Sequence, residues 1–566
     1  MATNLLPFVP PLLLLLLLAL SASASNFTSI DCGASGSYKD ENGIAWETDE
    51  SYVSNGENRV VQNPDLVPEP MRTLRVFSSR KKNCYPVSVP GGGRVLVRAS
   101  FYYGNYDEKS SPPTFALQFD ANSWETVVAS MDQVVFHEAI YDVFAEGTAV
   151  CVAQLEQGQL PFVSAIEVRT LETDMYEGVD SSFALLLKGR LAFGAPGVVR
   201  YVSKPPPLAF PFPWSNVAEV NLDEQEAIIR YPSDAYDRIW DPVAASDELI
   251  TTKSDTTVMD PTAVKDKPPA AVLLQAITTA NVSTDVVLFL SELLPTDPVP
   301  AYINLYFAEM SHLGSKDNNT FQVYVDGDPL IDAVNPPYQS VAEYLIGLKA
   351  ASASTKITLT ATPEATVPPL ISAMEVFVVR GGLSNGTDES DVGALIVLQQ
   401  KFEVLGDWAG DPCLPAKYTA DWVGCSSDPT PRITALYLSG YGLSGDLPDF
   451  SALTALQTID MSNNKITGRI PEFLGKLPDL KELNLADNKL SGAVPSSLTE
   501  NKKIKLTVCG NPSLSSSDQK PCDSSMGKPS TPRATKSSST SLKESRRNLV
   551  VALEAVISLF LLVLMA

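Results

Sequence analysis

The sequence predicts a multidomain, mostly β extracellular protein, with two tandem all-β sandwiches followed by a short capped solenoid. Three observations in the 566-residue chain support this fold class. Similar segments recur after about 206 to 208 residues, a second motif recurs every 23 to 24 residues, and the chain opens with a secretory leader. Recurrence on two length scales indicates duplicated domains and a stacked repeat array.

Residues 1–24 are expected to be a signal peptide. A leucine-rich core precedes Ala22, Ser23 and Ala24, which fit the A-x-A cleavage pattern, so the mature chain would start near Ser25. The formal charge of −24 disfavours nucleic acid as a partner, because nucleic-acid binding needs clustered Lys and Arg. A cationic peptide partner is compatible with this charge.

The long-period similarity predicts two related domains in tandem. The segment "PFVSAIEVR" at 161–169 matches "PPLISAMEVF" at 368–377, and Glu167 thereby corresponds to Glu375. Within the first copy, one set of apolar residues alternates with more polar neighbours: Val95, Val97, Ala99 and Phe101. A period of two places one set in a core and the other toward solvent or a second sheet.

Many short strands, frequent Pro and Gly and little helical periodicity predict that both domains are β-sandwiches. We expect the first over residues 25–203 and the second over residues 204–380, joined by the Pro-rich stretch 203–214. Residues 381–431 are expected to be a linker and cap, with a helix that Asp391 can cap at its start.

Residues 432–512 hold three copies of a short leucine-rich unit. These are "LSGDLP" at Leu443, "ITGRIP" at Ile466 and "LSGAVP" at Leu490, and their spacing is typical of a leucine-rich repeat. Asn464 and Asn488 suit an inward asparagine ladder that satisfies the backbone of the turns. Tyr441 takes that place in the first copy.

The cysteines of a secreted chain meet an oxidising environment. Because a solenoid exposes its core at both ends, we expect two capping disulfides: Cys413 with Cys425 before the first repeat, and Cys509 with Cys522 after the last. Seven cysteines leave one free or paired between chains. Pairing of Cys32 with Cys84 is a further option, and it would leave Cys151 as a buried thiol.

Several motifs resemble the malectin-like domain of plant receptor-like proteins: "IDCG" at Ile30, "NCY" at Asn83, "RASFYYGNYD" at Arg98 and "RYPSDAYDRIW" at Arg230. The GDPC stretch, 410–413, resembles the junction of symbiosis-receptor-type malectin-like, leucine-rich repeat receptor kinases. This resemblance implies two tandem malectin-like jelly-roll sandwiches. The sequence shows no Gly-rich phosphate loop with its lysine, no H-R-D and no D-F-G, so we expect a kinase-less receptor-like protein.

The inventory of reactive residues disfavours an enzyme. The only histidines are His137 and His312, no Cys/His spacing fits a metal site, and no G-x-S-x-G marks a nucleophile. Glu167 and Glu375 could suggest a glycosidase pair. Because each holds the same place in its own domain, we expect each to have a structural role. No cofactor and no metal are expected.

A carbohydrate site is a sharper hypothesis, because sugars stack their apolar faces on aromatic rings. The resemblance to malectin places aromatic loop residues in the stretch "FYYGNYD", although malectin has an aromatic pair where Asn105 and Tyr106 stand here. The candidate residues are Tyr102, Tyr103, Asn105, Tyr106, Asp107, Asn122 and Trp124. The alternative is that these rings pack internally, as aromatic strand residues usually do. Exposed, convergent rings would favour a sugar, and buried rings would favour protein contacts elsewhere.

These features predict a cell-surface receptor-like protein without a kinase. It would bind a cell-wall carbohydrate or a secreted peptide and act with a partner receptor kinase. The alternative is a protein–protein co-receptor or scaffold that binds no glycan, since short repeat arrays present a concave face for proteins.

The expected location is the extracellular face of the plasma membrane, reached through the secretory pathway. Sequons for N-glycosylation stand at Asn26, Asn281, Asn318 and Asn385. Residues 513–548 are a Ser-, Thr- and Lys-rich stalk. The apolar residues 549–566 form either a single-pass helix carrying Glu554 or the signal for a glycosylphosphatidylinositol anchor. The spacing favours the lipid anchor, attached at Ser537, Ser538 or Ser539.

Overall fold

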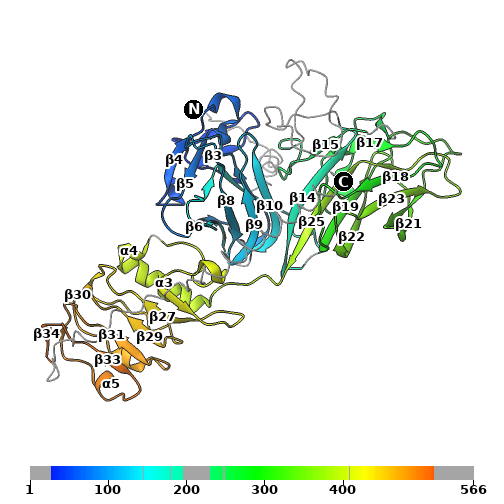
Figure 1. Ribbon diagram of the computed structural model, residues 1–566. Coiled ribbons are helices and arrows are strands. Elements are labelled where there is room, and N and C mark those ends of the chain that lie inside the picture. The colour runs from blue at the N-terminus through cyan, green and yellow to red at the C-terminus, as the bar shows by residue number, and fades with distance from the viewer. Residues whose placement is uncertain are drawn as a thin grey trace, which may run out of the picture.

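The computed structural model describes residues 27–143, 146–178, 180–195, 230–245, 249–406 and 408–515. It has the predicted fold class, since two β-sandwiches lie side by side and a leucine-rich repeat domain lies beside the first (Figure 1). The expected signal peptide, the Pro-rich joint, the stalk and the apolar tail lie outside the described residues. Among the described residues, no helix has the length and apolar character needed to cross a membrane.

The first sandwich packs two layers against each other, and their strands pair antiparallel except for β1 with β3, which are parallel. One layer belongs to an 11-stranded sheet and runs in the order β2 (Tyr38–Lys39), β3 (Ala45–Thr48), β1 (Phe27–Asp31), β13 (Ala165–Thr170), β7 (Gly93–Phe101), β10 (Val135–Val143) and β14 (Phe183–Phe193). The facing layer is β6 (Lys82–Ser88), β11 (Gly147–Gln154), β8 (Thr114–Phe119) and β9 (Asn122–Val128). A small sheet of β12 (Phe162–Val163), β5 (Thr73–Val76) and β4 (Glu57–Val60) closes one end.

The second sandwich continues the same large sheet. From β14 it runs through β25 (Ala373–Gly381), β19 (Val299–Phe307) and β22 (Ala342–Ala351), with β15 (Asp241–Val243) also paired to β14. The facing layer is β18 (Val286–Phe289), β23 (Lys356–Ala361), β20 (Phe321–Val325) and β21 (Asp328–Val334). A third sheet of β16 (Ile250–Lys253), β17 (Gln275–Thr278) and β24 (Leu370–Ile371) lies beside the short helix α2 (Ala270–Leu273).

Strand β14 therefore belongs to both sandwiches. Its first half pairs with β10 and its whole length pairs with β25, with a register shift between Leu187 and Gly189. The sequence predicted two domains in tandem but gave no sign of a shared strand. The predicted alternation is confirmed, since Val95, Val97, Ala99 and Phe101 lie in the core of the first sandwich. The residues between Val95 and Phe101 are buried as well, while Gly93 and Arg94 at the start of β7 are half-buried.

The repeat domain starts with helices α3 (Glu389–Lys401) and α4 (Glu403–Gly406). Asp388, and not Asp391, caps α3, because its side chain accepts from the backbone N–H groups of Ser390 and Asp391. The predicted cap is therefore wrong by one turn. The carboxylate of Asp391 instead accepts from the guanidinium of Arg432 at 2.8 and 2.9 Å.

A sheet of β26 (Val423–Cys425), β27 (Ile433–Tyr437), β29 (Thr458–Asp460), β31 (Glu482–Asn484) and β33 (Lys505–Thr507) lines one side of the solenoid. Two pairs of short strands and one short helix form its other sides. The pairs are β28 (Ser444–Gly445) with β30 (Lys465–Ile466) and β32 (Ser491–Gly492) with β34 (Ser513–Leu514), and the helix is α5 (Ser496–Thr499). Asn464 and Asn488 form the expected ladder, each accepting from one backbone N–H and donating to several carbonyls. Asn511 continues the ladder, an additional turn that the three-copy prediction missed.

Candidate functional site

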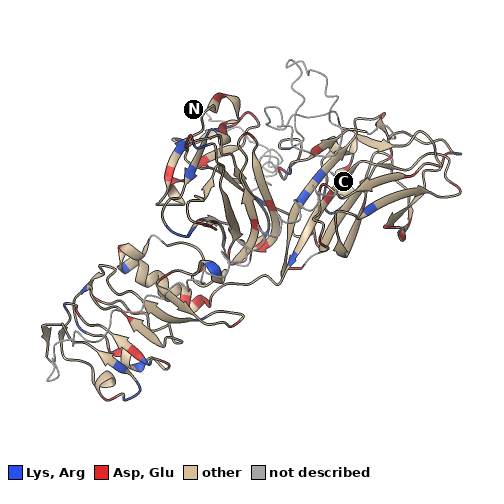
Figure 2. Cartoon of the chain, in the orientation of Figure 1, with Lys and Arg blue, Asp and Glu red and all other residues tan. Residues whose placement is uncertain are grey.

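A row of ion pairs crosses the large sheet on the face opposite the first core. In the strand register Glu167 stands opposite Arg98, Arg98 opposite Glu138, and Arg190 opposite Glu375. Arg98 contacts Glu138 at 2.8 Å and Glu167 at 3.2 Å, and Arg190 contacts Glu138 at 2.8 Å and Glu375 at 2.5 Å. Figure 2 shows charged residues on the strands where the two sandwiches meet. Glu167 and Glu375 are therefore ion-paired within the buried row, which fits the structural role expected of each.

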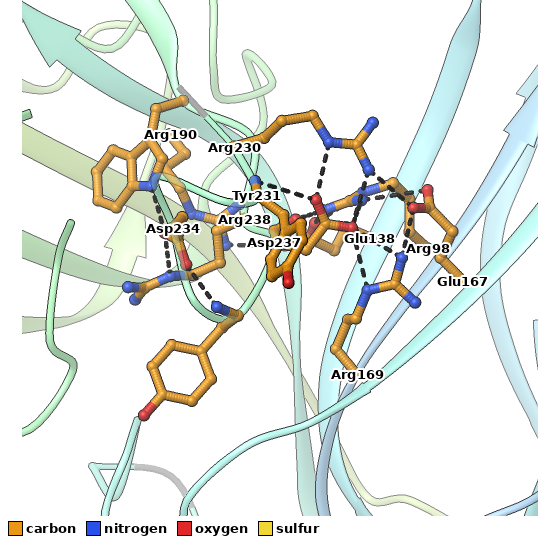
Figure 3. Close-up of polar contacts among 12 residues, drawn as sticks. Arg98, Glu138, Glu167, Arg169, Arg190, Arg230, Tyr231, Asp234, Asp237 and Arg238 are labelled. Atoms are coloured by element: carbon orange, nitrogen blue, oxygen red, sulfur yellow. Dashed lines mark hydrogen bonds and ion pairs between the residues drawn. The ribbon is translucent and has the colours of Figure 1, made fainter. Parts of the chain in front are cut away.

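The segment after residue 229 closes over this row (Figure 3). Asp237 accepts from Arg169 at 2.7 Å and from Arg230 at 2.8 Å, and Arg230 also reaches Glu167 at 3.0 Å. Burial opposes ionisation of Asp237, but the guanidinium groups of Arg169 and Arg230 outweigh it and hold the pKa of Asp237 well below its usual range. Such pairs are retained in a core because each charge is both compensated and hydrogen-bonded.

The residues predicted to bind carbohydrate do not form an open aromatic surface. Tyr103 is fully buried, Trp124 is 1% exposed and Tyr102 is 9% exposed. Tyr103 packs edge-on against Tyr106 at 5.4 Å between ring centroids, and its hydroxyl donates to Asp107. Because a sugar stacks only on an accessible ring face, the burial of Tyr102, Tyr103 and Trp124 favours the internal-packing alternative for these three rings, while Tyr106 is half-buried.

Two of the predicted polar residues serve as structural contacts. Asn105 donates to Gln62 at 3.0 Å. Asn122 exchanges two hydrogen bonds with the backbone of Ser384, at 2.8 and 3.1 Å, and so holds the linker that leads to the repeat domain. The sequence indicated that both residues follow strands. It did not indicate which distant residues they would hydrogen-bond.

A cleft of about 690 Å³ opens on the outer face of the first sandwich. Its floor carries Arg98, Ser100, Phe136 and Glu167. The lining continues along 65–72 and is completed by Lys39, Asp40, Glu41, Trp46, Val134, Arg230 and Ile239. The walls are short 3-10 turns at Pro64–Leu66 and Glu69–Met71, which start with the fixed φ of proline in their first turn. This cleft is the candidate ligand site.

Sequence reasoning missed this cleft because its residues come from six separate segments. Arg98 and Arg230 did appear within motifs that carry the family resemblance, and Arg98 is a charged residue in the buried part of β7, between Val97 and Ala99. A charged residue in a fully buried strand is informative, since Arg is almost never fully buried unless it is paired. That signal marks the floor of the cleft, although it cannot show the walls.

The GDPC stretch docks the repeat domain onto the first sandwich. Nζ of Lys82 donates to the backbone oxygens of Asp411 and Leu414, each at 2.9 Å, and burial lowers the pKa of Lys82 to about 8. Asp411 in turn accepts from Thr387, Cys413 and Leu414. Gly410 adopts φ +90° against the Cys84–Cys151 disulfide, where a side chain would meet Sγ of Cys84 at 2.4 Å.

The disulfides correct one prediction and confirm another. Cys84 is bonded to Cys151, its direct partner in the β6–β11 register, so the pairing of Cys32 with Cys84 is wrong and Cys32 is the buried free thiol. Cys413 is bonded to Cys425, as expected for the N-terminal cap. Cys509 is disulfide-bonded as well, and its expected partner Cys522 lies outside the described residues.

The predicted modification sites are partly placed. Asn281 and Asn385 are exposed, while Asn318 is half-buried and donates to the backbone oxygen of Glu364 at 3.1 Å. Asn26 and the expected anchor site at Ser537, Ser538 and Ser539 lie outside the described residues. No cluster of three or more His, Cys, Asp or Glu side chains in the described part of the chain has the geometry to hold a metal ion.

The architecture is thus two β-sandwiches that share a strand, with a docked leucine-rich repeat domain and a cleft on the outer sheet face. The chain belongs to the malectin-like domain family, whose model matches residues 30–204 and 215–379. A model of leucine-rich repeats (2 copies) matches residues 454–498.

The similar proteins are plant receptor-like proteins. A putative leucine-rich repeat receptor-like serine/threonine-protein kinase of Arabidopsis thaliana is 31% identical over 478 residues, which cover 81% of this chain and 50% of that protein. An uncharacterized protein of the same plant is 31% identical over 382 residues, covering 67% of this chain and 69% of that protein. The chain thus spans about half the length of the receptor kinases it matches.

Among solved structures, the plant receptor-like kinase ANX2 has a TM-score of 0.50 at 14% identity, covering 63% of this chain and 96% of that chain. A chain in the crystal structure of plant peptide RALF23 in complex with FER and LLG2 has a TM-score of 0.48 at 16% identity. The match covers 63% of this chain and 96% of that chain. At such low identity, the likeness to ANX2 shows the fold alone.

Proposed function

We propose that this protein is a cell-surface receptor-like protein without a kinase, which binds an extracellular ligand and acts with a partner receptor kinase. The observation that carries the proposal is the cleft of about 690 Å³, on a rigid sheet that both sandwiches share. A preformed cavity of several hundred Å³ with a few convergent polar groups is the usual form of a ligand site. The ligand class is a cell-wall carbohydrate or a secreted peptide, and the role is recognition and not catalysis.

The alternative function is a protein–protein co-receptor or scaffold that binds no glycan. The burial of Tyr103 and Trp124 favours this alternative over a sugar at the tyrosine loop. Exposed Tyr437 and Tyr441 on the repeat domain offer aromatic contacts of the kind that protein interfaces use.

The test is chemical cross-linking on intact plant cells that display the tagged full chain, followed by mass spectrometry of the captured membrane proteins. We expect a transmembrane receptor kinase among the cross-linked partners, with contacts that map to the described domains. A sample in which the chain is cross-linked only to itself or to soluble wall proteins would contradict the proposal.

The anchor is tested on the same cells with phosphatidylinositol-specific phospholipase C. Release of the protein would establish the lipid anchor that the spacing of residues 537–566 predicts, and it would make a transmembrane partner necessary for signalling. Retention, while a control anchored protein is shed, would establish a spanning helix with Glu554 inside it.

A further inference from the structure

We propose that the cleft of the first sandwich binds a basic segment of an extracellular peptide, with one Lys or Arg side chain held between the acidic rim and the apolar wall. This inference rests on the proposed function, because it names the ligand class of the receptor-like protein.

The wall of the cleft suits an aliphatic stem. Leu66 is 74% exposed, and Val67, Val134 and Phe136 are half-buried around the same opening. A Lys or Arg side chain lays its methylene groups along apolar surface and keeps its charged head in a polar environment.

The rim of the cleft carries more acids than bases. Four carboxylates belong to it, from Asp40, Glu41, Asp65 and Glu69, against two basic residues, Lys39 and Arg72. Two of these six are already engaged: Nε of Arg72 donates to the backbone oxygen of Val67, and Asp40 accepts from Trp46 Nε1 and from the backbone N–H groups of Asn42 and Ile44. In a chain of formal charge −24, an acidic rim around an apolar wall attracts a cation and retains its stem.

The floor of the cleft does not reverse this preference. Glu167 is bound by Arg98, Arg169 and Arg230, and Arg98 is also held by Glu138. These charges compensate one another within the buried row, so the rim decides which ligand is attracted. A free anion would have to compete with carboxylates that already occupy the guanidinium groups.

The same geometry argues against a sugar in this cleft. Trp46 lines the cleft but is 3% exposed, stacks against Tyr38 and donates from Nε1 to Asp40 at 3.0 Å. Its ring therefore offers no open face on which a sugar could stack. The accessible apolar groups are mostly aliphatic, and these suit a peptide side chain better than a pyranose.

The test uses a displayed library of random linear nonapeptides, selected against residues 25–548 of the chain. The most enriched peptides are synthesised, together with versions in which Arg is replaced by neutral citrulline or Lys by acetyl-lysine. Calorimetry then compares the wild type with the isosteric double variant D65N/E69Q. The matched control is E292Q/D297N, which removes the same charge from an exposed site on the second sandwich.

We expect enriched peptides to contain Arg or Lys and to bind about tenfold more weakly after neutralisation of that residue. D65N/E69Q should weaken binding by a similar factor and reduce its salt dependence, while E292Q/D297N should stay within about twofold of wild type. Unchanged thermal unfolding of both double variants shows that the fold is intact.

Three outcomes would overturn the inference: no enriched peptide, enriched peptides without a basic residue, or peptide binding that D65N/E69Q leaves unchanged. Binding of a neutral cello-oligosaccharide that D65N/E69Q abolishes would assign the cleft to a glycan instead. If any of these occurs while the full chain is still cross-linked to a receptor kinase, the peptide assignment fails and the proposed function stands.

Discussion

Nε of Arg190 donates a hydrogen bond to Oε1 of Glu375 at 2.5 Å, inside the sheet that both sandwiches share. Both side chains are fully buried, and Arg190 also donates to Glu138 of the first sandwich at 2.8 Å. One guanidinium thus compensates a carboxylate on each side of the domain boundary. We infer that the two sandwiches unfold as one cooperative unit.

Replacement of Arg190 by Met should destabilise both sandwiches together. The substitution keeps an apolar stem but leaves Glu138 without one partner and Glu375 without its guanidinium. Breaking a buried pair in this way costs about 3–5 kcal/mol. Urea unfolding of residues 25–548, followed by intrinsic fluorescence, measures the loss.

The control for this variant is Arg59→Met, which breaks a surface pair with Glu57 whose side chains are both about half exposed. Such pairs contribute about 0–1 kcal/mol. Equal losses for the two variants, or separate unfolding transitions for the two sandwiches in Arg190→Met, would show that Arg190 does not couple them.

Gly410→Ala should undock the repeat domain from the first sandwich without unfolding either. The added Cβ would lie 2.4 Å from Sγ of Cys84. The alanine would also have to adopt a backbone φ of +90°. We expect faster backbone hydrogen exchange at 408–414 and a wider distribution of distances in small-angle scattering. Gly440→Ala is the control, since it shares a positive φ of +75° but has nothing within 4 Å, so it should leave the junction intact.

The repeat domain was the easiest part to predict, because its core positions recur along the sequence itself. Leu443, Ile466 and Leu490 are all buried, and the glycines that follow them at 445, 468 and 492 all have positive φ. The ladder residue Asn511 lies 23 residues after Asn488 and could have been found from that spacing.

The sandwiches were predicted as domains but not as a joined sheet. Pairing of β14 with both β10 and β25 depends on contacts between segments that are distant in the chain, and these leave no periodic signal. The candidate site was missed for the same reason. Aromatic composition suggested the tyrosine loop as a ligand site. In this fold, however, Tyr103 packs against Phe162 inside the core.

Cys32 should resist alkylation in the native protein. Its side chain is fully buried, and burial raises the pKa of its thiol well above the usual range, so little reactive thiolate is present. Iodoacetamide added without a reductant should label Cys32 only after denaturation, as peptide mapping would show. Label on Cys84 or Cys151 under those conditions would contradict the assigned disulfide.

Two carboxyl groups meet where the segment around Asp266 crosses the large sheet. Asp266 accepts from the backbone N–H of Tyr176 at 2.6 Å and from Asn304, and its own backbone N–H donates to Glu343 at 3.3 Å. Burial and the adjacent Asp266 raise the pKa of Glu343 to about 9. A hydrogen bond between two carboxyl groups requires a proton, because ionised carboxylates only accept.

The stability of the second sandwich should therefore fall as the solution becomes alkaline. The folded state retains a proton that the unfolded chain releases near the ordinary pKa of 4.5, so the favourable contribution is complete below about pH 4.5 and is lost as pH rises toward about 9. Urea midpoints measured across this range should decline for the wild type, and the slope should flatten in Glu343→Gln, which has no proton to lose. Glu292→Gln, an exposed carboxamide exchange on the same sandwich, should keep the wild-type slope. A Glu343→Gln variant with an unchanged slope would show that the shared proton does not contribute to stability.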